Sequence, residues 1–441
     1  MASAPVRASG FIAVALASAL VACLAAAAFN LAIDPFGIYG LLEVPGLNAY
    51  KPAKYQRVRL AKAFELHRVE PRAVVLGTSR SHLGIRPAHG GWDTGADPRY
   101  NLAFDGATTH EMYAYLHDAQ AARPLREVIL GLDTWQLGTD PSQARPDFDP
   151  MLLDVPGDPW CHLRRHMAQL RILFSIDTLV ASIRTVAAQD ETDADWLAPD
   201  GQRLGEVFFR RPGEPFMSDG PADYFRQVDR QEFGFKLDLG PAAHPHRGAA
   251  EAAPDRSSLE YVRLMVDFCR EHHIDLRVFI TPAHAHQMEI SAAAGEWPKI
   301  EAGKRALVGM LAEDAARHPG AAAFPLWDFS GYSSVTTEPV PVAGSRREMD
   351  FYWDSSHFKQ GVGDWVLDRV FGTRDPDHPV PADFGVKLET GTIDAALIRI
   401  RGDHAAYRNS HRDDVAEIDA MLADTLRQIP PERRAPIGPV P

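Results

Sequence analysis

The stretch "VVLGTSRSHLGI", from Val74 to Ile85, decides how this chain is interpreted. Its branched apolar residues predict a buried strand that ends at Gly77, and the polar residues that follow predict the start of a helix. Open α/β proteins present reactive groups at such strand-to-helix turns, because ligands bind at the carboxyl ends of parallel strands. A simple turn with a helix N-cap would have the same pattern. The rest of the sequence is therefore needed to distinguish a reactive turn from a purely structural one.

The remaining sequence alternates short apolar runs with amphipathic ones. Strands are expected at 73–76, 101–103, 128–132, 275–282 and 323–331, and helices at 55–68, from 108, and at 160–188, 259–272, 299–317, 359–371 and 413–428. This alternation predicts an α/β fold with a doubly wound, mostly parallel sheet flanked by helices, of the flavodoxin-like kind. One edge of such a sheet would collect residues 77–81, 105–106, 133–135 and 281–286.

The N-terminal segment predicts a membrane anchor. Residues 11–33, "FIAVALASALVACLAAAAFNLAI", carry no charge and are long enough to cross a bilayer of about 30 Å. A cleaved signal peptide has a shorter apolar core, which favours an uncleaved transmembrane helix. "LVAC", ending at Cys23, resembles a lipoprotein processing box, but an apolar stretch follows it where a polar linker would be expected.

Arg7 indicates that residues 1–10 stay in the cytoplasm. The protein is then a single-pass protein of the cytoplasmic membrane, with the chain from Asp34 onward facing the periplasm or the outside. Beyond the anchor we expect a juxtamembrane segment at 34–71, a catalytic domain at 72–372 and a C-terminal extension at 373–441 with a helix and a Pro-rich tail. Residues 189–253, rich in Gly, Pro and charge, are interpreted as an insertion that covers the site.

Composition narrows the classes of partner. The chain has 46 Lys and Arg against 59 Asp and Glu, a net charge of −13, and no long basic run, so we expect no nucleic-acid partner. The three cysteines fit no zinc spacing, and neither a metal nor a cofactor is expected. Cys161 and Cys269 could form one disulfide or remain buried thiols.

The sequence "DSSH" supplies the groups that an attacking serine needs. Asp354 and His357 are three residues apart, so the carboxylate can reach Nδ1 of the imidazole and leave Nε2 to face a serine hydroxyl. A second Asp-x-x-His, Asp375 to His378, lies in the proline-broken segment "RDPDHPVP". Because a strand-like run and an amphipathic helix flank only the first, we take Asp354 and His357 as the functional pair.

Taken together, these motifs resemble those of the SGNH hydrolase superfamily, also called GDSL-like esterases, over about residues 72–372. The matching positions are Gly77-Thr78-Ser79 after the first strand, Gly106 in "NLAFDGAT", and the late Asp354 and His357. The resemblance implies that Ser79 is the nucleophile, His357 the base and Asp354 the residue that orients it. It also implies an oxyanion hole made by the N–H groups of Ser79 and Gly106.

The anchored layout and "GTSRS" look closest to extracytoplasmic members of that superfamily that serve envelope polysaccharides. These include alginate O-acetylation proteins and the D-alanine transfer protein of teichoic acid synthesis. The resemblance implies a serine acyl esterase or O-acyltransferase that acts on a cell-envelope or exported polysaccharide. By the same analogy, a membrane-embedded acyl donor protein would be a partner.

Two positions depart from the superfamily pattern. Thr78 stands where an aspartate is usual, and Asp133 stands where an asparagine amide normally donates to the oxyanion. An ionised Asp133 accepts hydrogen bonds only, so it is structural or protonated, or Arg80 or another N–H donates in its place. A non-catalytic, anchored glycan-binding or assembly protein with a degenerate fold therefore stays an alternative. A phosphoester hydrolase in which Arg80 holds the phosphate is a third.

Five further residues are candidates at the same edge. Ser81 is the rival nucleophile within the motif. Arg80 and Asp133 are candidate substrate contacts, and so are His284 and His286 of "TPAHAHQ", which follow a predicted strand.

Overall fold

The structure is a computed structural model that describes residues 4–41, 43–140, 142, 144–154, 159–189, 196–211, 213–237 and 256–429, with side chains from residue 9 onward. The chain forms two compact units, one of residues 1–68 and 149–195 and one of residues 69–148 and 196–441. Residues 149–195 therefore group with the N-terminal segment, although the sequence analysis assigned them to the catalytic domain. All three cysteines are free thiols.

The smaller unit is helical. Its helices are α1 (Ala4–Ile33), α2 (Pro52–Gln56), α3 (Val58–Val69, which ends one residue beyond the unit), the short η2 (Pro150–Leu152), α6 (Cys161–Leu173) and α7 (Ile176–Ala187). Within the described residues, one helix, at Ser9–Ile33, is long and apolar enough to cross a membrane. This agrees with the apolar helix expected at 11–33.

A mixed six-stranded sheet forms the centre of the larger unit. Its strands are β1 (Ala73–Leu76), β2 (Arg99–Asn101), β3 (Glu127–Leu132), β4 (Asp275–Ile280), β5 (Leu326–Asp328) and β6 (Val386–Lys387). They lie in the order β2-β1-β3-β4-β5-β6, and all neighbours are parallel except β5 and β6. The first five strands have the order of flavodoxin-like sheets, whose switch point lies between β1 and β3. The α/β prediction is confirmed, and the antiparallel β6 was not expected.

Helices cover both faces of this sheet. The helices of the larger unit are α4 (Ser79–Gly84), α5 (Thr109–Ala122), η1 (Thr134–Leu137), α8 (Gly205–Phe208), α9 (Pro215–Ser218), α10 (Pro221–Lys236), α11 (Ser258–Glu271), α12 (Ala285–Ala293), α13 (Trp297–Arg317), α14 (Gln360–Phe371), α15 (Ile393–Ser410) and α16 (Arg412–Gln428).

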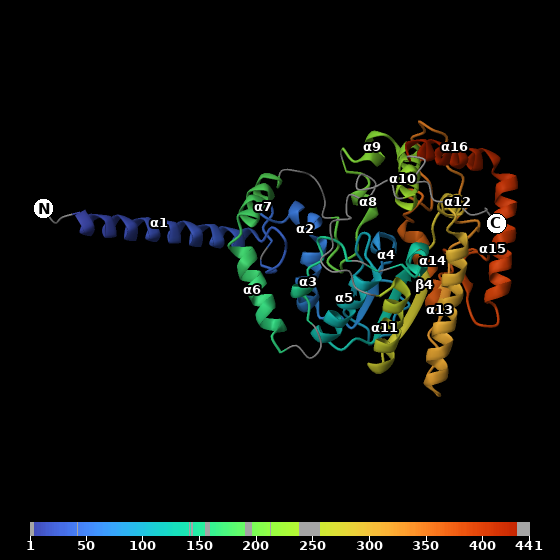
Figure 1. The fold of residues 1–441 in the computed structure, drawn as a ribbon, viewed down its shortest axis with the longest axis horizontal. Coiled ribbons are helices and arrows are strands. Elements are labelled where there is room, and N and C mark those ends of the chain that lie inside the picture. Colours follow the sequence, from blue (N-terminus) through green and yellow to red (C-terminus); the bar gives the residue numbers. More distant parts are fainter. Residues whose placement is uncertain are drawn as a thin grey trace. The chain divides into compact units, whose positions relative to one another are not determined.

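The layering follows from the apolar strands. Every residue of β1 and β3 is buried, as expected of parallel strands with helices on both faces. Helix α11 packs against both α5 and α13 on one face (Figure 1). On the other face, Val75 and Ile129 of the strands share a core cluster with Val362 and Val366 of α14.

The segment expected as an irregular insertion at 189–253 is largely helical where the structure describes it. Helices α8, α9 and α10 lie there, and α10 is 16 residues long. Its periodicity was hard to recognise because its buried face carries the charged Asp229 beside Phe225 and Phe233. Residues 190–195, 238–255 and the Pro-rich tail from 430 lie outside the described residues.

Candidate active site

Ser79 sits where the sequence predicted it, at the turn between β1 and α4. It is the first residue of α4, and Thr78 caps that helix by accepting a hydrogen bond from the N–H of Arg80 at 3.4 Å. Gly77 before it packs so closely against Ser81 that any side chain at position 77 would collide with Ser81. The turn leaves Ser79 partly exposed while its neighbours are buried.

A continuous chain of hydrogen bonds joins Ser79 to Asp354. His357 Nε2 lies 2.9 Å from Ser79 Oγ, and His357 Nδ1 lies 2.8 Å from Asp354 Oδ2. Asp354 is fully buried and also accepts the N–H groups of Ser356 and His357 at 2.8 and 2.9 Å. These backbone donors keep the carboxylate in place, so that it selects the tautomer with a proton on Nδ1 and leaves Nε2 to accept from Ser79.

Close packing of α4 on α14 keeps the two halves of this chain together. A Cβ at Gly363 of α14 would overlap the carbonyl of Gly84 in α4, so only glycine allows the two backbones to approach this closely. Arg80 adds a polar link, because its Nε and Nη2 donate to Ser356 Oγ at 3.2 and 3.0 Å. Helix α4, which carries Ser79, is thus joined directly to the loop that carries His357.

Two backbone N–H groups are available for an oxyanion. Neither the N–H of Ser79 nor that of Gly106 donates to any described residue. Gly106 has a φ of +58°, a conformation that favours glycine, and its carbonyl accepts Arg145 Nε at 2.8 Å. Arg145 therefore helps to fix the turn in which the Gly106 N–H is presented.

Asp133 has a structural role in the described geometry. Its Oδ2 accepts Thr78 Oγ1 at 2.8 Å and Trp135 Nε1 at 3.1 Å, and its Oδ1 accepts Thr281 Oγ1 at 2.6 Å. Arg80 Nη1 lies 3.5 Å from Oδ1. The buried carboxylate therefore ties together the residues that follow β1, β3 and β4.

These contacts argue against the expectation that Arg80 and Asp133 contact substrate. Both side chains are almost fully buried, and each is occupied by partners within the protein. Ser81 is likewise disfavoured as the rival nucleophile. It is fully buried between Gly77 and Gly131, and its Oγ has no hydrogen-bond partner among the described residues.

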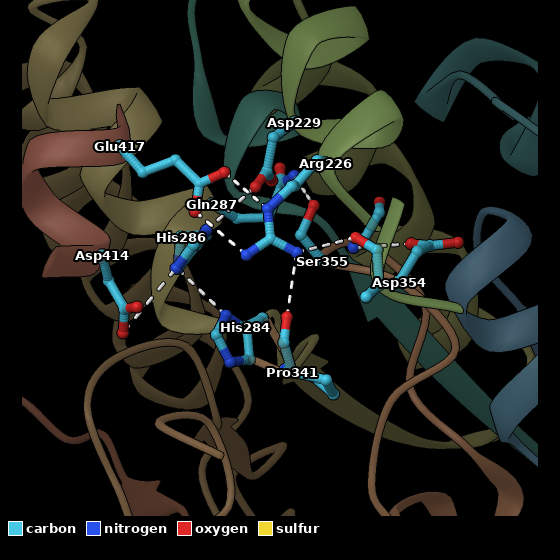
Figure 2. Close-up of polar contacts among 12 residues, drawn as sticks. Arg226, Asp229, His284, His286, Gln287, Pro341, Asp354, Ser355, Asp414 and Glu417 are labelled. Atoms are coloured by element: carbon cyan, nitrogen blue, oxygen red, sulfur yellow. Dashed lines mark hydrogen bonds and ion pairs between the residues drawn. The ribbon is translucent and has the colours of Figure 1, made fainter. Parts of the chain in front are cut away.

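His284 and His286 lie in the interior and are almost fully buried, which argues against the predicted substrate contact. His284 Nε2 lies 2.8 Å from the carbonyl oxygen of Glu338, and its Nδ1 accepts the N–H of His286 at 3.2 Å. His286 Nδ1 lies 2.9 Å from Asp229 of α10, as Figure 2 shows, with Asp414 of α16 on its other side. Helices that are distant in the sequence thus cover both rings.

The pKa values of the two imidazoles are shifted in opposite directions. Burial lowers the pKa of His284 to about 3, assisted by its neighbour His286. Burial alone would also lower the pKa of His286, but the carboxylates of Asp229 and Asp414 outweigh it and raise that pKa to about 9. Near neutral pH His284 is therefore neutral and His286 is a cation.

This buried cluster supports the loop that contains Asp354. Gln287 Nε2 donates to Ser355 Oγ at 2.9 Å, and the N–H of His284 donates to the Ser355 carbonyl at 3.1 Å. Both contacts come from the start of α12 and are close to Asp354 in Figure 2. The "TPAHAHQ" segment is thus linked to the candidate catalytic groups through the backbone that holds them.

Several residues near the site were not recognised from the sequence. The ring of Phe209 lies 6.2 Å from that of His357 and is stacked on Trp353 at 4.9 Å. Arg203 pairs with Asp105, the residue before Gly106, at 2.5 Å. Phe209 and Arg203 come from the segment interpreted as an insertion, which indicates that this segment does border the site.

Glu232 of α10 is another carboxyl group near the site. Burial raises its pKa, which the neighbouring charges of Lys236, Arg80 and His357 partly offset. No local motif marks Glu232 in the sequence, since its position depends on how α10 folds back over the sheet.

One group of side chains in the smaller unit has the residue types of a metal site. Ligand atoms of Asp154, Cys161 and His162 lie within 4.8 Å of one another. Arg165 Nη2 already pairs with Asp154 at 3.0 Å, which neutralises the carboxylate that an ion would need.

Comparison with known proteins found no family model that matches this chain and no curated protein with significant similarity to it. Function therefore has to be argued from the geometry of the site.

Proposed function

We propose that the protein is a membrane-anchored serine acyl esterase or O-acyltransferase of the SGNH type, which acts on a cell-envelope or exported polysaccharide. The observation that carries this proposal is the chain Ser79–His357–Asp354, with contacts of 2.9 and 2.8 Å. Serine, imidazole and carboxylate in that order are what acyl transfer through a serine ester requires.

In the first step Ser79 Oγ attacks the acyl carbonyl while His357 Nε2 takes its proton. The carbonyl oxygen becomes an oxyanion and accepts hydrogen bonds from the N–H groups of Ser79 and Gly106. Asp354 stabilises the imidazolium without taking the proton. His357 then protonates the leaving alcohol, which departs and leaves an acyl ester on Ser79.

In the second step His357 takes a proton from the incoming hydroxyl, which attacks the acyl carbonyl of the Ser79 ester. The bond between the acyl carbon and Ser79 Oγ then breaks, and His357 returns the proton to Ser79 Oγ. Water as acceptor gives hydrolysis, and a sugar hydroxyl gives transfer. We expect the aromatic pair Phe209 and Trp353 beside His357 to limit the access of water to this side of the site, which would favour a sugar acceptor. A membrane-embedded acyl donor protein would load Ser79 in the transfer reaction.

The apolar helix α1 supports the proposed location. It would place the protein as a single-pass protein of the cytoplasmic membrane, with the remaining chain in the periplasm or outside. A phosphoester substrate has less support, because the Arg80 guanidinium is buried against Ser356 and Asp133.

The test uses the full-length chain in detergent, with a fluorophosphonate probe and an activated acetyl ester. We expect one covalent adduct, on Ser79, and its loss in Ser79→Ala together with a fall in turnover of at least about 10³-fold. Ser81→Ala is the matched control, and it should keep both labelling and turnover. If the parent chain is not labelled, the proposed mechanism is wrong and a glycan-binding or assembly role is favoured.

The two Asp-x-x-His pairs offer a second matched comparison. Asp354→Asn should reduce turnover by roughly 10³- to 10⁴-fold, because an amide at this position favours the wrong imidazole tautomer. Asp375→Asn alters the exposed pair with His378 and should leave turnover unchanged. Equal effects of the two substitutions would contradict the assignment of Asp354.

A further inference from the structure

Helix α6 exposes an apolar stripe on its surface. Leu163, Met167, Leu170 and the following Phe174 recur at helical spacing and are each about half exposed, and Trp160 precedes the helix at 64% exposure. Large apolar side chains in such a contiguous row normally mark a surface that binds something. We refer to these five residues as the apolar stripe.

The stripe continues onto α7, where Ile176 and Ile183 are 78% and 56% exposed. The opposite face of α7 is buried, although it consists of small and polar residues such as Thr178, Ser182 and Thr185. This distribution is the reverse of that in a helix of a soluble domain, which buries its apolar side. The exposed face of α7 is therefore suited to surroundings less polar than water.

Both helices are fixed to the end of the membrane-spanning candidate α1. Asn30 of α1 donates through Nδ2 to the carbonyl of Leu173, and its Oδ1 accepts Ser182 Oγ, both at 2.9 Å. Figure 1 shows α6 and α7 lying across the C-terminal end of α1, and both contact it. If α1 crosses a bilayer, these two helices lie in the plane of its surface.

The charges on α6 favour an anionic surface. The helix carries Arg164 and Arg171 along with two histidines, and no Asp or Glu, while its third arginine, Arg165, is buried against Asp154. Cationic residues beside an apolar row, with aromatic side chains such as Trp160 and Phe174 at its ends, are typical of helices that lie in a membrane interface.

We propose that the apolar stripe docks into the boundary between headgroups and acyl chains of the same membrane that α1 crosses. The proposal rests on the membrane location proposed above. A second copy of the chain or an integral membrane protein would be a different occupant, and the experiment separates these from lipid.

The test measures how lipid-borne nitroxides quench a fluorophore attached to single cysteines of the full-length chain. The protein is reconstituted alone into vesicles of phosphatidylethanolamine and phosphatidylglycerol. Cys161→Ser is present throughout, and Cys269 is fully buried and so unreactive. One variant keeps the native Cys23 on α1 as a reporter of the bilayer interior. Two others, with Cys23→Ser, carry Met167→Cys in the stripe or His162→Cys on the polar flank of the same helix.

We expect the Cys23 label to be quenched best by a nitroxide deep in the acyl chains and the Met167→Cys label best by one near the headgroups. The His162→Cys label should be quenched several-fold less than that at 167. Leaving out phosphatidylglycerol should reduce quenching at 167 and not at Cys23, because only the former depends on charge.

Equal quenching at 167 and 162, with Cys23 still quenched, would overturn the docking and leave the anchor intact. Loss of quenching at Cys23 would overturn the anchor and the docking together. A label at 167 that escapes lipid quenchers, combined with disulfide-linked dimers through Met167→Cys, would show that a second copy covers the stripe, and would also overturn the proposal.

Discussion

At the scale of single residues, Asp133 shows how one buried carboxylate can connect the residues around a candidate site. It accepts hydrogen bonds from the hydroxyl groups of Thr78 and Thr281 and lies beside the guanidinium of Arg80. The Thr78 hydroxyl belongs to the residue before the nucleophile. Any change in the charge or donors at position 133 is therefore transmitted to Ser79.

We predict that Asp133→Asn destabilises the protein and does not raise its activity. The amide would direct an NH₂ group at hydroxyl donors and leave the Arg80 charge without its carboxylate, at a cost of about 3 kcal/mol in the free energy of unfolding. Urea unfolding and ester turnover measure the two effects. A faster enzyme of unchanged stability would instead indicate that position 133 serves the oxyanion directly.

The buried Asp229–His286 pair predicts a pH dependence of stability. The pKa of His286 is raised from its ordinary 6.5 to about 9. The contribution of the protonated His286 to the free energy of unfolding is therefore complete below pH 6.5 and is lost as the pH rises to about 9. The loss amounts to about 3 kcal/mol. Urea unfolding of the parent chain across this pH range should show the decline in the free energy of unfolding. Asp229→Asn should be less stable at pH 6 and lose that part of the slope, and parallel slopes would contradict the assignment.

Residues were predictable from the sequence where the chemistry is local. Ser79 follows its strand directly, and Asp354 and His357 lie within one turn of each other, so neither placement depends on distant parts of the chain. The burial of His284 and His286 was not predictable, because their position after β4 does not indicate how deep they lie. Their burial comes from α10 and α16, which are tens of residues away in the sequence.

At the scale of elements, the contact between α4 and α14 sets the distance between nucleophile and base. Glycines at 84 and 363 allow the two helices to touch through their backbones. The sequence does not predict this packing, because nothing in it distinguishes Gly363 from the nearby Gly361. The same holds for α10, whose buried Asp229 obscures the apolar period, and for the two-residue β6.

We predict that Gly363→Ala separates the two halves of the triad. The new methyl group overlaps the Gly84 carbonyl, so the helices must move apart, at a cost of about 1–3 kcal/mol and with a large loss of turnover. Gly361→Ala on the same helix meets open space and should be neutral or slightly stabilising. Thermal unfolding and turnover of both variants provide the check, and an active Gly363→Ala enzyme would refute this role of the contact.

At the scale of the whole molecule, the membrane-spanning candidate is also part of a folded unit. Ala27, Asn30 and Ile33 of α1 are buried in the described structure, whereas the earlier turns of the helix are exposed. A boundary drawn at residue 33 from hydropathy alone therefore cuts through a packed core. Hydropathy detects the apolar run but not which of its turns contact protein.

We predict that a chain beginning at Ala26 is more stable than one beginning at Asp34. The longer chain keeps the hydrogen bonds of Asn30 to Leu173 and Ser182, and the shorter one loses them together with buried Ile33. In detergent the shorter chain should melt at least about 5 °C lower. Equal melting temperatures would mean that the end of α1 contributes nothing to the fold.

The hydrogen bond between Ser79 and His357 spans 278 residues of sequence, and this separation has a consequence for biosynthesis. The ribosome releases the nucleophile early and its base only after more than half of the chain has followed. Until residue 357 has emerged and β1, β3 and β4 have aligned, Ser79 is an ordinary hydroxyl. Nascent or prematurely terminated chains thus carry the serine without its imidazole partner, so the hydrogen-bonded chain from Ser79 to Asp354 is acquired only by a molecule that is almost complete.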